Sequence, residues 1–66
     1  MWVVVYIAPN RKIANYLKQL LEIEGILVKT KDINVAAKEE KNVEVMVSEV
    51  EIEEATEVIN NALQRA

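Results

Sequence analysis

The sequence predicts one small α+β domain with the element order β-α-β-β-α. The chain opens with an unbroken apolar run that is rich in β-branched residues, as in a buried strand. Two later segments repeat apolar residues at the spacing of amphipathic helices, and a short segment before the second of them alternates apolar and polar residues. Because 66 residues leave room for only one modest core, residues 1–66 are expected to form a single domain.

The apolar run at residues 2–8 is expected to form the first strand. Pro9 ends it, because proline lacks the amide hydrogen that a ladder needs and holds the preceding residue in an extended conformation. Asn10 then stands where a helix N-cap belongs, with a side-chain oxygen that accepts from the amides of the first turn.

The first helix is expected over residues 11–24. Gly25, the only glycine of the chain, lies just beyond the last residue of the helical pattern. It is expected to take the left-handed conformation that ends a helix, with Ile26 as the apolar contact that commonly follows. The apolar stripe of this helix consists of Ile13, Ala14, Leu17, Leu20 and Leu21.

The second strand is predicted over residues 26–31, and the third over residues 43–47, where the alternation is clean. Residues 32–41 are mostly polar and are interpreted as a long hairpin connection. Ser48 is expected to cap the last helix, with Glu51 in the capping-box position. The apolar stripe of that helix consists of Ile52, Ala55, Val58 or Ile59, Ala62 and Leu63.

This element order favours two helices on one face of a three-stranded antiparallel sheet with the strand order 1-3-2. It is the ferredoxin-like arrangement without its fourth strand, so that the first strand becomes an edge. Regular alternation along that strand places half of its side chains on the face without helices. The side chains expected toward the helices are Val3, Val5 and Ile7. The expected interaction surface on the open face consists of Trp2, Val4, Tyr6 and Met46, with Lys29, Lys31 and Glu44 around it.

An apolar open face next to an unprotected edge strand indicates that something covers it. The preferred explanation is a homodimer, since small domains without disulfides or metals commonly gain stability by self-association. Two alternatives are that residues 64–66 or the 32–41 connection fold over this surface, or that another protein partner binds there.

Catalytic, metal and cofactor sites are not expected in this chain. It has no cysteine and no histidine, which removes disulfides, the preferred zinc ligands and the usual nucleophile and base pairs. Ser48 is better explained as a helix cap, and the many glutamates are expected to be solvated. The chain is therefore expected not to be an enzyme.

One small-molecule hypothesis competes with the interaction module. Arg11 and Lys12 stand in the first turn of the first helix, where the helix dipole disfavours cations. Together with Asn10 and the free amides of that turn, they would form a small anion site, and the protein would then act as a small-molecule or anion sensor. The simpler explanation is that both basic side chains extend into water.

Nucleic acid and membranes are not expected as partners, because the net charge is −3 and no basic patch is evident. Trp2 and Tyr6 on an open sheet face could stack on RNA bases, but the basic companions are few. No apolar run reaches the roughly 20 residues that span a bilayer. The apolar N-terminal stretch lacks the charged segment of a signal peptide, so a cytoplasmic location is expected.

The pattern as a whole resembles a family of small bacterial proteins described as prokaryotic signal-transducing proteins. The residues that carry the resemblance are Val3-Val4-Val5-Tyr6-Ile7-Ala8, Asn10, Leu21-Glu22-Ile23-Glu24-Gly25-Ile26, Val45-Met46-Val47-Ser48-Glu49 and Glu53-Glu54-Ala55. The resemblance supports the ferredoxin-like fold. The family description carries a signalling role, but the matching residues specify the fold rather than a function. Residues 32–41 depart from the family, whose members tend to have a shorter hairpin with glycine at this point.

Overall fold

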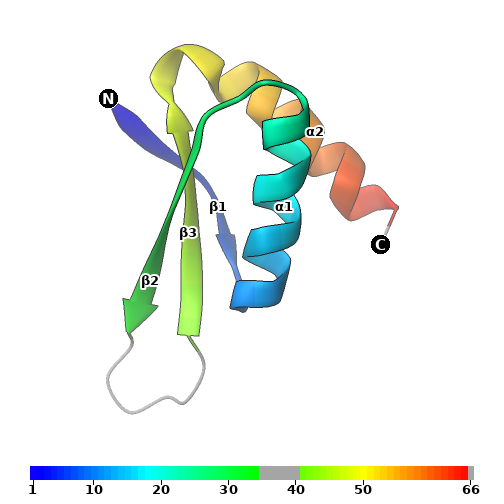
Figure 1. Cartoon of the computed structure of the whole chain (residues 1–66). Helices are drawn as coiled ribbons and strands as arrows, with labels where there is room; N and C mark the ends of the chain where they lie inside the picture. Colours follow the sequence, from blue (N-terminus) through cyan, green and yellow to red (C-terminus); the bar gives the residue numbers. More distant parts are fainter. Residues whose placement is uncertain (35–40, 66) are drawn as a thin grey trace.

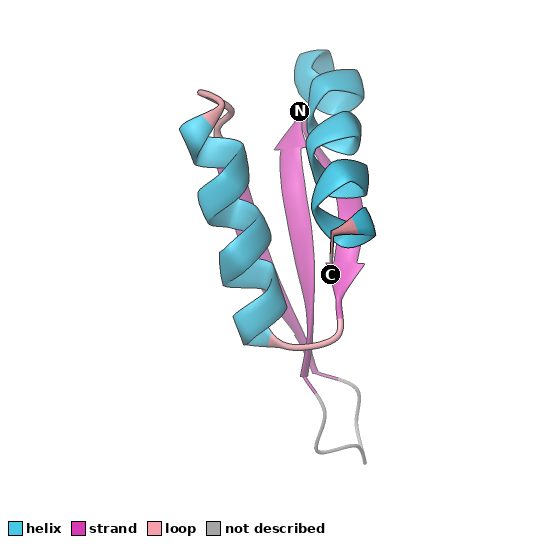
Figure 2. Cartoon of the chain, turned by 90° about the vertical axis from the view of Figure 1, so that its right-hand side faces the viewer, coloured by secondary structure: helices cyan, strands magenta, loops and turns pink. Residues whose placement is uncertain are grey.

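The computed structural model describes residues 1–34 and 41–65, and its element order is the predicted β-α-β-β-α (Figure 1). The three strands form one antiparallel sheet in the order β1-β3-β2, as predicted. Both helices lie on the same face of this sheet and leave the other face open (Figure 2). The elements are β1 (Trp2–Ala8), α1 (Arg11–Ile23), β2 (Val28–Asn34), β3 (Lys41–Ser48), a short 3-10 helix η1 (Glu49–Glu51) and α2 (Ile52–Gln64).

The hairpin strands β2 and β3 are longer than the prediction. Asp32 pairs with Val43 and Ile33 pairs with Asn42, so residues 32–34 and 41–42 belong to the ladder rather than to the connection. Ladder hydrogen bonds join backbone groups and require no apolar side chains, which is why the polar sequence concealed this part of the hairpin. The rest of the predicted connection, residues 35–40, lies outside the described residues.

Both ends of α1 are formed by the residues that were predicted to form them. The Asn10 side-chain oxygen accepts a hydrogen bond from the Ile13 amide at 2.9 Å. At the other end Gly25 has a φ of +82°. Its amide donates to the Glu22 carbonyl at 2.9 Å, and the Ile26 amide donates to the Leu21 carbonyl at 3.0 Å. This pair of bonds is the Schellman motif, and it directs the chain back toward the sheet.

The start of α2 differs from the prediction. The Ser48 side chain makes no capping hydrogen bond, and residues 49–51 form the 3-10 turn η1 before α2 begins at Ile52. Ser48 is the last residue of β3 and pairs with Trp2, so its conformation follows the strand rather than a helix cap. The predicted capping box of Ser48 and Glu51 is therefore wrong.

The core lies between the sheet and the helix layer. Val43, Val45 and Val47 of the central strand point toward the helices and are fully buried, as predicted. No polar or charged side chain is buried among the described residues. The buried helix residues above the sheet are Ala14, Leu17 and Leu21 of α1 and Ala55, Ile59 and Ala62 of α2.

A β-bulge in β1 changes which side chains reach the open face. Val4 pairs with Met46 and Tyr6 pairs with Val45, so that Val5 is an extra residue without a partner in β3. An extra residue reverses the alternation of all residues that follow it in the strand. Tyr6 accordingly packs against the core, and Ile7 is exposed on the open face. The predictions that Tyr6 points away from the helices and that Ile7 points toward them are wrong.

Candidate functional site

The open face of the sheet is built from cross-strand rows that the register defines. Val4 of β1, Met46 of β3 and Lys29 of β2 form one row. Ile7, Glu44 and Lys31 form the next row, on the far side of the bulge. Trp2 pairs with Ser48 at the end where β3 leaves the sheet. In each full row the residue from β1 is apolar and the residue from β2 is a lysine.

The apolar side chains of this face are considerably exposed. The exposed fractions are 44% for Trp2, 40% for Val4 and 52% for Ile7. Lys29 lies over the Trp2 ring, with its Nζ atom 5.9 Å from the ring centroid, a cation–π distance. An antiparallel sheet normally presents polar residues on its wet face, so three exposed large apolar residues on one strand indicate a contact surface.

The two edge strands of the sheet differ in charge. β2 carries Lys29, Lys31 and Asp32, whereas β1 has no charged residue from end to end. Lysines on an edge strand oppose pairing with a further strand. The β2 edge is therefore protected against strand addition, and the β1 edge carries no such charge.

Three of the four residues predicted for the interaction surface come together on the open face, namely Trp2, Val4 and Met46. Tyr6 does not join them, because the bulge turns it into the core. Ile7 takes its place, and reasoning from the sequence missed it. No glycine or other bulge-forming signal stands in residues 2–8, so regular alternation was the only expectation that the sequence offered.

The described residues give no support to a cover formed by the chain itself. Gln64 and Arg65 end α2 within the helix layer, and Arg65 lines a hollow between the two helices. Residues 32–34 are paired in β2, and Lys41 is paired in β3. Of the segments considered as covers, only residues 35–40 and 66 lie outside the described part of the structure.

Two of the three proposed anion-binding residues, Asn10 and Arg11, are engaged in other contacts. The Asn10 oxygen is used as the helix cap. The Arg11 guanidinium forms an ion pair with the Asp32 carboxylate and donates to the Thr30 hydroxyl oxygen at 2.9 Å. Lys12 is exposed. Among the described residues, the Asn10 oxygen and the Arg11 guanidinium are thus turned to protein partners rather than toward a common anion position.

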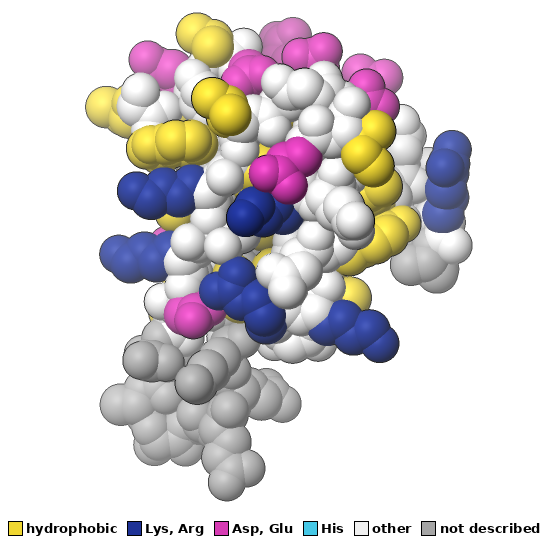
Figure 3. All heavy atoms as spheres, viewed as in Figure 1, with side chains coloured by type: hydrophobic (Ala, Val, Ile, Leu, Met, Phe, Trp, Pro, Cys, Tyr) yellow, Lys and Arg dark blue, Asp and Glu magenta, His cyan; other side chains and the backbone are white. Residues whose placement is uncertain are grey.

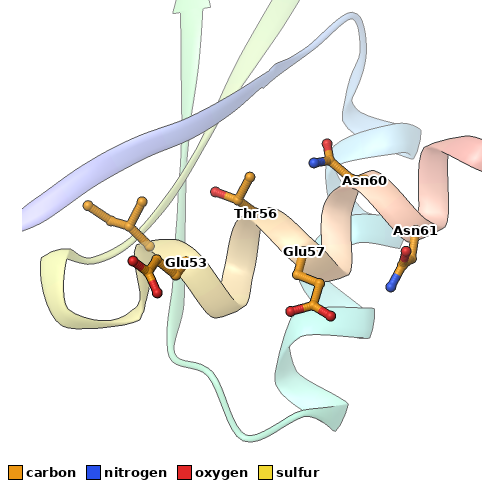
Figure 4. Close-up of a pocket in the computed structure, with 6 residues that line it drawn as sticks. Glu53, Thr56, Glu57, Asn60 and Asn61 are labelled. Carbon is orange, nitrogen blue, oxygen red and sulfur yellow. The ribbon is translucent and has the colours of Figure 1, made fainter.

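Two shallow hollows lie on the helix side of the described residues. One, of about 200 Å³, lies between α1 and α2 and includes Tyr16, Leu20 and Val58 in its lining. The other, of about 470 Å³, runs along α2 and is lined by that helix alone (Figure 4). Across the described residues, no group of three or more acidic side chains is placed to hold a metal ion. No helix in the described part of the chain is long and apolar enough to cross a lipid bilayer.

Comparisons of the chain with protein-family models, curated proteins and solved structures gave no match.

Proposed function

We propose that this chain is a non-enzymatic protein-interaction module that works as a homodimer, with β1 and the adjoining part of the open face as its contact surface. The observation that carries the proposal is that Trp2, Val4 and Ile7 are exposed on the same face of one strand, and that this strand is also a sheet edge. Burying such side chains removes apolar surface from water, which is the main driving force of protein association.

A second copy of the chain is the occupant that fits this surface best. The single small core of a 66-residue chain gives a narrow margin of stability, and self-association is a common way to extend it. β1 has no charge to repel its own copy. An antiparallel pair of identical strands is self-complementary about a two-fold axis, the commonest symmetry of soluble oligomers.

The proposal includes a regulatory role in the cytoplasm of a bacterial cell. That part rests on the resemblance of the strand, glycine and helix segments to the signal-transducing family. The dimer rests on the chemistry of β1 and does not depend on the resemblance.

The experiment is analytical ultracentrifugation of the wild type and of Trp2→Glu at tens of micromolar. We expect the wild type to sediment as a dimer and Trp2→Glu as a folded monomer, because a carboxylate in an apolar contact loses its hydration. Ile7→Glu is a second variant that tests the same strand on the other side of the bulge. Circular dichroism verifies that both variants fold.

Ile23→Glu is the matched control. Ile23 is also apolar and is 75% exposed, but it ends α1 in the helix layer. This variant is expected to dimerise like the wild type. A monomeric wild type would overturn the proposal, and so would folded Trp2→Glu and Ile7→Glu variants that both remain dimeric.

A further inference from the structure

We infer that the contact with the second copy has a second layer, formed by the flank of α2 that lies beside the free edge of β1; this inference rests on the proposed homodimer. The flank consists of Ile52, Thr56, Asn60 and Leu63, and it is called the α2 flank below.

The position of the α2 flank follows from the two sides of α2 that are already occupied. Ala55 and Ile59 face the sheet and are buried. Val58 and Arg65 line the hollow shared with α1. With about 3.6 residues per turn, the side of the helix opposite α1 carries residues 52, 56, 60 and 63. Figure 4 shows Thr56 and Asn60 on one side of α2 and Glu57 and Asn61 on the other.

This flank lies over the β1 edge of the sheet. The helices stand side by side in one layer, with α2 on the β1 side and α1 on the β2 side (Figure 2). Since β1 is an edge strand, no further element of the described structure lies beyond it in the sheet. The α2 flank and the outer edge of β1 therefore form one continuous side of the molecule in both of its layers.

The chemistry of the α2 flank is that of a contact surface. None of its four residues is charged, although α2 as a whole is rich in glutamate. Leu63 is 40% exposed, and Ile52 is half-buried. Glu53 lies next to Asn60 at the outer margin of the flank, since the two are seven residues apart, and Glu57 lies further round the helix. Cores of protein interfaces are depleted in charge in the same way.

The opposite side of the molecule, formed by α1 and β2, carries charged residues in both layers. The corresponding flank of α1 carries Arg11, Lys18 and Glu22, again at spacings that share one side of a helix. Below it, β2 carries Lys29 and Lys31. Figure 3 views the molecule from this side, where lysine and arginine side chains gather over β2 and α1. One side thus carries charges along both its strand and its helix, whereas on the other side β1 has no charge and Glu53 stands only at the margin of the α2 flank.

A contact through both layers, strand and helix, also provides more of the contact area that a stable dimer needs. β1 has 7 residues, so it is about 23 Å long, and a contact one strand wide falls short of the roughly 800 Å² per partner of a typical stable interface. Antiparallel pairing of β1 with its copy would make a six-stranded sheet and place both α2 helices on one face as antiparallel neighbours. On the other face, the exposed apolar side chains of the two β1 strands would lie side by side and shield one another from water. The two α2 flanks then meet across the two-fold axis and bury Leu63.

The experiment compares two adjacent asparagines on α2 that receive the same substitution. Asn60→Glu introduces a carboxylate on the α2 flank, and Asn61→Glu introduces it on the side that faces α1. Leu63→Glu is the second variant on the flank. Sedimentation equilibrium measures the dissociation constant of each. We expect Asn60→Glu and Leu63→Glu to raise it by about tenfold or more, and Asn61→Glu to change it by less than about twofold.

The outcomes separate this inference from the proposed function. A dimeric wild type with unchanged dissociation constants for Asn60→Glu and Leu63→Glu would refute the α2 layer and leave the β1 contact standing. Equal weakening by Asn60→Glu and Asn61→Glu would also refute it, because the effect would then follow from net charge alone. A monomeric wild type would overturn both.

Discussion

At the scale of single residues, the backbone conformation at Gly25 restricts the choice of amino acid most. Its φ of +82° lies in the left-handed region, which residues with a Cβ atom adopt at a cost. A Cβ atom added there would meet nothing within 4 Å, so the cost of substitution comes from the backbone and not from a clash. The residue holds the turn that brings Ile26 into the core.

Gly25→Ala is therefore expected to lower the free energy of unfolding by about 1 kcal/mol, measured by urea denaturation. Gly25→Asn is the control, because asparagine tolerates the left-handed conformation and is expected to lose less. A loss for asparagine equal to or greater than that for alanine would contradict the backbone explanation.

Single residues with a local role were the most predictable from the sequence. Asn10 and Gly25 form hydrogen bonds or turns with neighbours only a few positions away, so their surroundings are contained in the adjacent sequence. Ser48 had an equally strong local signal, but its conformation is set by pairing with Trp2 from the other end of the chain. Local signals fail where a distant strand determines the backbone.

At the scale of elements, the ion pair of Arg11 with Asp32 joins the first turn of α1 to β2. Both side chains are about half exposed, at 45% and 52%, so water screens the pair. A double-mutant cycle of Arg11→Gln and Asp32→Asn, measured by urea denaturation, is expected to give a coupling energy below about 1 kcal/mol that declines further in salt. A coupling above about 2 kcal/mol would show that the pair is shielded from water in solution.

The bulge at Val5 is the element feature that the sequence could not reveal. β1 consists entirely of apolar residues, so neither face of the strand is marked by polar side chains and no change of phase is visible. β3 alternates, and the directions predicted for the side chains of residues 43–47 were correct because Glu44 interrupts the valines. The exchange of Tyr6 for Ile7 on the open face depends on packing across the sheet, which a single strand does not encode.

At the scale of the whole molecule, the layers and the strand order were predictable, since two amphipathic helices and three strands have few ways to bury their apolar faces. The candidate surface was predictable only in part. Trp2, Val4 and Met46 follow from alternation before the bulge and in β3, whereas Ile7 follows from the bulge. The uncharged α2 flank emerges only once α1 and β1 have fixed the orientation of α2.

The proposed dimer makes the stability of the fold depend on protein concentration. When unfolding is coupled to dissociation, mass action favours the folded dimer as concentration rises. The apparent free energy of unfolding is expected to increase by about 1.4 kcal/mol of dimer for each tenfold increase in concentration. Urea denaturation at low and high micromolar concentration, followed by the fluorescence of the only tryptophan, Trp2, measures this dependence.

Because Trp2 is lost in Trp2→Glu, Ile7→Glu serves as the monomeric comparison, and its midpoint is expected to be the same at both concentrations. A wild-type midpoint that does not move with concentration would mean that the folded chain is stable alone, with Trp2, Val4 and Ile7 left open to water.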